Sequence, residues 1–84
     1  MMNLMEACKI AKKYFATNLG KGSIAKVTMN EEAWFFISGE PNRELVGSVV
    51  ISVDKQNGDI VLIDLLSDEG FELIKATTPI ELPC

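Results

Sequence analysis

Histidine is absent from this 84-residue chain, and cysteine, tryptophan and tyrosine are rare. Histidine is the usual general base near neutral pH and the commonest metal ligand, so its absence removes every Ser-His and Cys-His catalytic pair. The two cysteines match no zinc or redox spacing. We therefore expect no enzymatic activity, no metal and no cofactor. Cys8 is interpreted as a small core residue and Cys84 as a free, exposed thiol.

Long apolar runs and a basic surface are lacking as well. No stretch approaches the roughly 18 apolar residues of a membrane span, and no signal-peptide pattern opens the chain, so we expect a cytoplasmic protein. The net charge of −4 is uneven, because residues 1–30 carry five lysines and one glutamate, whereas residues 31–84 carry three basic and eleven acidic residues. Phosphate binding needs clustered basic side chains. Nucleic acid and membrane are therefore not expected partners, and a basic protein is favoured.

The residues that are present predict one small globular domain over 1–84. Hydrophobic residues make up 48% of the chain and charged residues 24%, which is typical of a folded domain. Residues 3–20 predict an amphipathic helix, with apolar residues at three- and four-residue spacing. Asn3 is suited to cap its start, with Glu6 three positions on, and Gly20 to end it in a left-handed conformation.

Strand patterns follow the helix. Alternating or β-branched apolar residues predict four strands, over 23–29, 33–38, 45–53 and 59–66. Residues 67–79 predict a short helix capped by Ser67, with Phe71 and Ile74 on its buried side. Two prolines near the C-terminus predict a coil or an edge segment there. The expected fold class is α+β, with the first helix packed on a four-stranded, mainly antiparallel sheet.

The stretch VDKQNGD, residues 53–59, resembles a calcium-binding loop. Counting from Asp54, however, the glycine falls at the fifth position instead of the sixth, and Leu65 stands where the bidentate glutamate belongs. A type I turn followed by Gly58 at positive φ explains every residue of the stretch. We interpret it as a hairpin turn.

This hairpin sets a register with an unusual consequence. Asp54 faces Asp59, Val53 faces Ile60 and Ile51 faces Leu62, which gives one apolar face for the helix to cover. The opposite face is also apolar, through Val50, Val61, Ile63 and Leu65. One helix cannot cover both faces. The second face needs the C-terminal segment, a second copy of the chain or another protein.

Paired carboxylates and one aromatic strand are the candidate contact residues. Glu31-Glu32 and Asp68-Glu69 occupy predicted turn and helix-start positions, where a solvated surface or a charged binding patch is favoured over catalysis. Trp34 belongs to a strand of consecutive aromatic residues, whose side chains must point to both faces. It is either a core residue or an anchor for an interface.

The order of these segments resembles the immunity protein 35 family of small bacterial domains. The family pattern is an amphipathic helix, a tryptophan-containing strand, a glycine before a strand, and a Val-Asp-Lys, turn, Gly hairpin. In this chain these features are Trp34, Gly47, Val53-Asp54-Lys55 and Gly58, within a match over residues 4–66. The resemblance implies a protein that binds and neutralises a secreted bacterial toxin inside the producing cell.

The functional prediction is therefore a non-catalytic immunity protein that binds a cognate, basic toxin. The alternative is a homodimeric structural or regulatory module that pairs through the second sheet face. The predicted partner contacts are Glu31, Glu32, Trp34, Asp68, Glu69 and Glu72.

Overall fold

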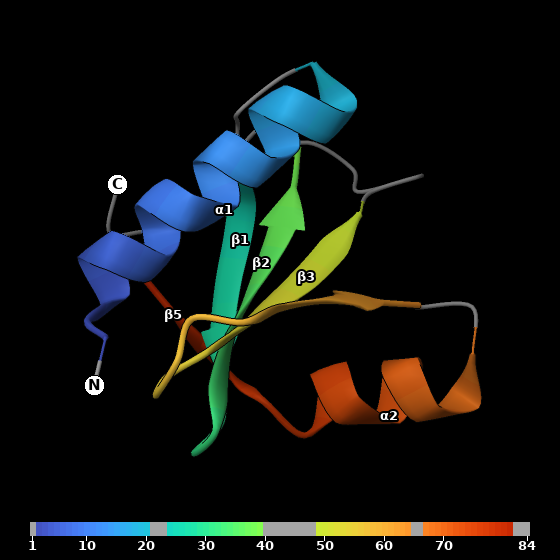
Figure 1. The fold of residues 1–84 in the computed structure, drawn as a ribbon. Helices are drawn as coiled ribbons and strands as arrows, with labels where there is room; N and C mark the ends of the chain where they lie inside the picture. Colours follow the sequence, from blue (N-terminus) through green and yellow to red (C-terminus); the bar gives the residue numbers. More distant parts are fainter. Residues whose placement is uncertain (1, 21–23, 40–48, 65–66, 82–84) are drawn as a thin grey trace.

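The computed structural model describes residues 2–20, 24–39, 49–64 and 67–81, without the side chain of residue 19. It confirms the α+β class: a long helix, an antiparallel sheet and a short second helix (Figure 1). The elements are α1 (Leu4–Leu19), β1 (Ile24–Met29), β2 (Ala33–Ser38), β3 (Val50–Asp54), β4 (Ile60–Ile63), α2 (Asp68–Lys75) and β5 (Thr78–Ile80).

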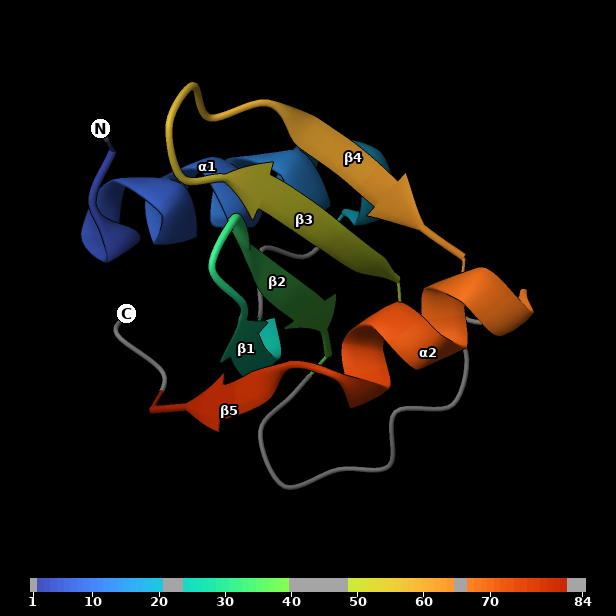
Figure 2. The same cartoon turned by 90° about the horizontal axis from the view of Figure 1, so that it is seen from below.

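The sheet has five strands in the order β4-β3-β2-β1-β5, and every neighbouring pair is antiparallel. The fifth strand is the difference from the predicted four. It forms because the segment after α2 lies along β1, with Val27 facing Ile80 and Met29 facing Thr78. Figure 2 shows α1 and α2 on opposite faces of the sheet, so the molecule has three layers.

The predicted caps of both helices are confirmed. The Asn3 side chain accepts a hydrogen bond from the backbone N–H of Glu6 at 2.9 Å, and Gly20 ends α1 with φ of 77°. The Ser67 hydroxyl accepts one from the backbone N–H of Gly70 at 3.0 Å. Each side chain satisfies a donor that the first helical turn leaves unpaired.

The main core lies between α1 and the sheet. The buried face of α1 presents side chains at the predicted three- and four-residue spacing, and these pack on alternate residues of β1, β2 and β3. The buried residues of this core are Ala7, Cys8, Ala11, Phe15, Ile24, Val27, Trp34, Phe36, Ile51 and Val53. Trp34 therefore takes the core position that was one of its two predicted roles.

Cys8 is fully buried in this core, as predicted, but it is also disulfide-bonded, which the sequence analysis did not foresee. The sequence contains one other cysteine, Cys84, whose predicted exposed thiol lies outside the described residues. Spacing along the chain carried no signal for this bond, because disulfide pairing depends on the fold and not on sequence distance.

The second face of the sheet carries a smaller core of Phe35, Ile37 and Val50. α2 lies over part of this face, with Ile74 packed against the cluster. The C-terminal segment thus supplies part of the cover that the two-sided sheet requires.

The predicted burial of Phe71 is wrong, because 53% of its side chain is exposed. α2 contacts the rest of the molecule through a different side. Gly70 is its buried residue, and a side chain at this position would overlap the backbone carbonyl of Asp64. With Gly70 and Ile74 turned inward, the neighbouring Phe71 points outward, where the Lys75 ammonium lies 5.8 Å from its ring centroid.

The β3–β4 hairpin has the predicted register, with Val53 facing Ile60 and Ile51 facing Leu62. Gly58 has the predicted positive φ of 77°. Both strands are shorter than predicted, since β3 begins at Val50 and β4 ends at Ile63. Residues 45–48 and 65–66, which the sequence analysis added to these strands, lie outside the described residues.

Candidate functional site: an acidic groove beside β4

Two turns meet at one end of the sheet. The β1–β2 turn is closed by Asn30, whose side-chain oxygen accepts hydrogen bonds from the backbone N–H groups of Glu32 and Ala33 at 2.8 and 2.9 Å. The backbone N–H of Lys55 donates to the backbone carbonyl of Glu32 at 3.0 Å. This bond ties the β1–β2 turn to the β3–β4 turn and fixes the spacing of their acidic side chains.

Asp54 shapes the second turn. One of its carboxylate oxygens accepts hydrogen bonds from the backbone N–H groups of Gln56 at 2.7 Å and Asn57 at 3.2 Å. The side-chain oxygen of Asn57 accepts one from the N–H of Asp59 at 2.9 Å. Aspartate and asparagine commonly close turns in this way. The polar residues of VDKQNGD thus act as turn residues, as predicted.

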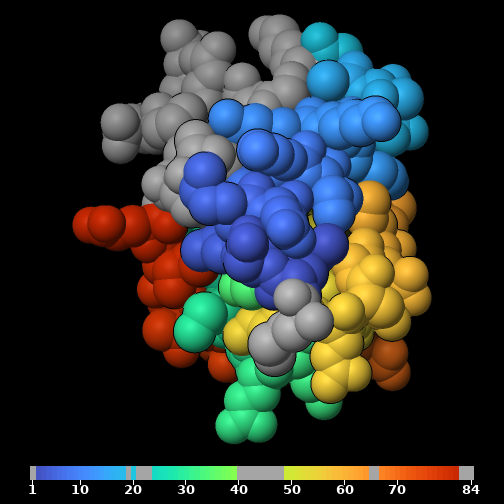
Figure 3. All heavy atoms as spheres, turned by 60° about the vertical axis from the view of Figure 1, so that its left-hand side comes forward, coloured from blue at the N-terminus to red at the C-terminus, as the bar shows by residue number. Residues whose placement is uncertain are grey.

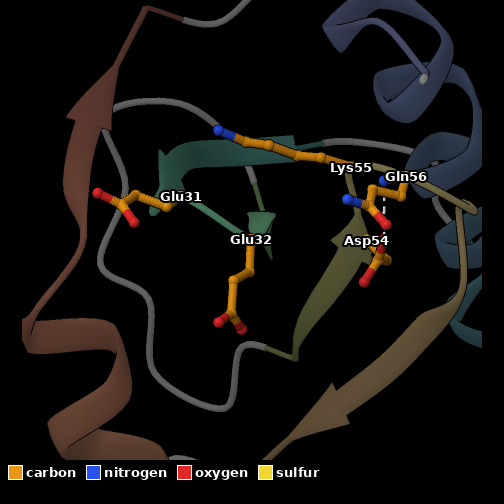
Figure 4. Close-up of a pocket in the computed structure, with 5 residues that line it drawn as sticks. All are labelled: Glu31, Glu32, Asp54, Lys55 and Gln56. Atoms are coloured by element: carbon orange, nitrogen blue, oxygen red, sulfur yellow. Dashed lines mark hydrogen bonds between the residues drawn. The ribbon is translucent and has the colours of Figure 1, made fainter.

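A hollow of about 280 Å³ lies where the two turns meet. Its lining residues are Glu31, Glu32, Asp54, Lys55 and Gln56 (Figure 4). In Figure 4, Glu32 and Asp54 point to the same side, and the Lys55 chain extends in another direction. The Lys55 ammonium lies 5.4 Å from the ring centroid of Trp34, whose side chain belongs to the core under α1. Lys55 is therefore directed away from Glu32 and Asp54, toward the side of the hollow on which Glu31 lies.

An apolar groove of about 320 Å³ adjoins this hollow, between α2 and the uncovered part of the second sheet face. Its lining combines apolar residues of β2, β4 and α2 with acidic residues of the two turns. The lining residues are Asn30, Glu32, Ala33, Phe35, Ser52, Asp54, Asp59, Val61, Ile63 and Leu73. Glu32 and Asp54 border both spaces. We call the two together the acidic groove.

The alternation of strand residues explains this composition. Thr28, Phe35, Ser52 and Val61 face one another across neighbouring strands, and the row formed by Ala33 and Asp54 lies next to them. Side chains of such rows share one face of a sheet. α2 covers only part of this sheet face. The apolar floor of the groove therefore stays open beside the carboxylates at the strand ends.

The structure brings together some of the predicted contact residues. Glu31 and Glu32 are exposed and line the acidic groove. Trp34 is 8% exposed and lies in the core, so it supports the turns from the α1 side instead of presenting a surface anchor. The acids of α2, Asp68, Glu69 and Glu72, are exposed, and none of them is among the described residues that line the groove.

Three further functional candidates were not among the predicted contact residues, although Val61 was predicted on the second apolar face of the sheet. Exposed apolar side chains flank the groove or lie near it: Val61 is 56% exposed, Leu62 62% and Leu73 39%. The apolar character of β4 on both faces was the available signal for the first two. No sequence signal marked Leu73, because the orientation of α2 depends on the tertiary contact made by Gly70.

No protein-family model, curated protein or solved structure matches this chain. The groove's own chemistry is therefore the basis for assigning a function. Within the described ranges, no group of three or more His, Cys, Asp or Glu side chains is arranged to hold a metal ion. Neither of the helices in those ranges is long and apolar enough to cross a bilayer. An apolar floor with a carboxylate rim is suited to bind a side chain that has an apolar stem and a cationic head.

Proposed function

We propose that this protein is a non-catalytic immunity protein that binds and neutralises a cognate bacterial toxin through the acidic groove. The observation that carries the proposal is the juxtaposition of an open apolar floor, formed by Val61 and Leu73, with a rim formed by Glu32, Asp54 and Asp59. It is supported by the family resemblance of residues 4–66 and by the acidic balance of the chain after residue 30.

The two parts of the groove have different roles in binding. Burial of the apolar floor gives affinity, because it removes apolar surface from water. The rim carboxylates speed the encounter with a basic surface and exclude acidic partners. A lysine or arginine of the toxin satisfies both parts, with its stem on the floor and its charged head at the rim.

The predicted contact residues divide into a centre and a periphery. Glu31 and Glu32 form the centre, together with Asp54, because all three line the hollow between the turns. The acids of α2, Asp68, Glu69 and Glu72, extend the acidic surface beyond the groove. Trp34 lies in the core, with the Lys55 ammonium 5.4 Å from its ring centroid.

Co-expression with a toxin encoded beside this protein's own gene tests the proposed function. We expect the growth of toxin-producing cells to be restored and the two proteins to co-purify as a complex. Absence of both rescue and complex would overturn the proposal.

Charge reversal tests the role of the rim. We expect Glu31→Lys combined with Glu32→Lys to slow association with the toxin by about tenfold or more at low salt, because like charges then meet across the interface. The matched control is Glu6→Lys with Glu81→Lys, the same change of charge at exposed positions that do not line the groove. Association rates measured by surface plasmon resonance at two salt concentrations distinguish the pairs. Equal effects would show that the groove has no special part in binding.

The alternative function is a homodimeric module that pairs through the second sheet face. α2 lies on part of that face, with Ile74 against the Phe35, Ile37 and Val50 cluster, so two sheets cannot pack face to face unless α2 moves. Sedimentation equilibrium separates the two functions. A stable dimer without affinity for the toxin would favour the module.

A further inference from the structure

β4 forms one edge of the sheet, and its side chains are exposed on both faces. Ile60 is 38% exposed, Val61 56% and Leu62 62%. Consecutive strand residues point to opposite faces. β4 is therefore not fully covered by α1 on one face of the sheet or by α2 on the other.

The outer edge of β4 has backbone groups directed away from β3. The backbone N–H of Asp54 donates to the carbonyl of Asp59 at 3.0 Å, which makes these facing residues a hydrogen-bonded pair. Hydrogen-bonded and non-hydrogen-bonded pairs alternate along an antiparallel ladder. The N–H and C=O groups of Ile60 and Leu62 accordingly point outward, where another strand can pair with them.

The two edges of the sheet differ in their protection. Natural edge strands avoid unwanted pairing by being very short or by carrying proline, lysine or a bulge. β5 has three residues and contains Pro79. β4 reads IVLI and carries neither a proline nor a charge, and its ladder with β3 is regular. β4 is short as well, with four residues, but an edge strand without proline, charge or a bulge suits strand pairing with a partner.

A hollow lies on each side of β4. The acidic groove borders it on the α2 side through Val61 and Ile63. A second hollow, of about 280 Å³, lies on the α1 side and is lined by Ile10, Lys13, Tyr14, Thr17, Asn18 and Ile60. In Figure 3 the orange atoms that include β4 are exposed beside α1, whereas β3 packs beneath α1 through Ile51 and Val53. A strand added at this edge would direct alternate side chains toward the two hollows.

We propose that β4 takes up an extended segment of the partner protein as a further strand of the sheet. Apolar side chains at every second position of that segment enter the acidic groove, and a lysine or arginine among them meets the rim of Glu32, Asp54 and Asp59. The intervening side chains rest on the second hollow, between α1 and Ile60. This inference rests on the proposed function, and it specifies how the partner is held.

Charge identifies the occupant as a basic segment of another protein. A second copy of the chain would pair through its own β4, and the sequence from Asp59 to Asp64, DIVLID, contains two acids and no base. The aspartates at the two ends of this segment in the second copy would bring further negative charge to the carboxylate rim of the groove. Like charges directly opposite one another in a ladder are destabilising.

A phage-displayed library of random ten-residue peptides tests this binding mode without the toxin. Selection on the wild-type protein is expected to enrich sequences with apolar residues at alternate positions and lysine or arginine on the same face. Failure to enrich any sequence, or enrichment of acidic or helical patterns, would overturn the inference.

Backbone pairing is tested by proline substitution in β4. Leu62→Pro removes an outward N–H, whereas Leu62→Ala removes much of the same exposed side chain and keeps that N–H. We expect Leu62→Pro to weaken binding of the selected peptides about tenfold or more relative to Leu62→Ala. Circular dichroism verifies that both variants are folded. Equal binding by the two variants would show that the edge is not used.

Hydrogen exchange of the wild-type protein gives a second readout that does not depend on a folded variant. The amides of Ile60 and Leu62 are expected to exchange at least about tenfold more slowly in the peptide complex, while the Val61 amide, already in the β3 ladder, changes little. Unchanged exchange at Ile60 and Leu62 overturns the inference.

The toxin complex separates this inference from the proposed function. If the complex forms equally well with Leu62→Pro and Leu62→Ala, the immunity function stands and strand addition fails. If selected peptides pair with β4 but the toxin is neither bound nor neutralised, strand addition stands and the immunity function fails. A concentration-dependent dimer that Leu62→Pro abolishes would overturn the inference in favour of a second copy.

Discussion

At the scale of single residues, the hydroxyl of Thr28 is the buried side-chain polar atom that has no hydrogen-bond partner in the described part of the chain. Thr28 is 4% exposed and faces Phe35 from β1. A buried hydroxyl without a partner has lost its hydration and gained nothing in return. We expect Thr28→Val, which keeps the branched shape, to raise the free energy of unfolding by about 1 kcal/mol. Urea denaturation followed by Trp34 fluorescence measures the change.

Thr77 provides the matched control for this substitution. Its hydroxyl donates to the backbone carbonyl of Ile74 at 2.6 Å. Thr77→Val removes this bond and is expected to lower the free energy of unfolding by roughly 0.5–1.5 kcal/mol. The same destabilisation at both positions would contradict our interpretation of Thr28.

Residues whose role is local were predictable, and those whose role depends on tertiary contacts were not. The structure confirms the predicted roles of four cap and turn residues, each of which interacts with residues a few positions away along the chain. They are Asn3, Gly20, Asp54 and Gly58. The exposure of Phe71 depends on how α2 is rotated against the sheet, which no local pattern specifies.

At the scale of elements, α2 is held against the hairpin by a glycine. Gly70 lies in its first turn, and an added Cβ would overlap the backbone carbonyl of Asp64, which cannot move as freely as a side chain. We expect Gly70→Ala to lower the free energy of unfolding by about 1–3 kcal/mol, although alanine has the higher helix propensity. Thermal unfolding followed by circular dichroism measures this loss.

Glu72→Ala is the control for the glycine substitution, because it introduces alanine at an exposed position of the same helix. It is expected to change the free energy of unfolding by less than about 0.5 kcal/mol. If Gly70→Ala stabilised the protein, helix propensity would outweigh the contact with Asp64 and our account of α2 would be wrong.

The predicted elements were largely correct in type and less so in extent. Period and capping identified α1 and the hairpin register, since both follow from local spacing. β5 was foreseen only as a coil or an edge segment, because three residues around Pro79 become a strand through pairing with β1. The apolar pattern of β4 correctly indicated a two-sided sheet, but α2 covers only part of the second face, so the groove itself was not foreseen.

At the scale of the whole molecule, the lysines of α1 and the acidic groove lie on opposite sides of the sheet. The lysines of α1 lie on the layer that covers the main core, and the acidic groove lies on the opposite side of the sheet, next to α2. The sequence predicted the uneven charge, because it follows from composition along the chain. It predicted that Asp54 faces Asp59, but it did not predict that Glu32 would lie beside them, since Glu32 belongs to another turn, which is joined to theirs by the bond between Lys55 and Glu32.

The disulfide at Cys8 also acts on the whole molecule, because Cys8 lies in the core between α1 and the sheet. Disulfides restrict the unfolded chain. We expect a reductant to lower the free energy of unfolding by about 2–4 kcal/mol. Urea denaturation with and without the reductant measures the difference. Cys8→Ala should be insensitive to the reductant, and an equal response of both proteins would show that the bond does not stabilise the fold.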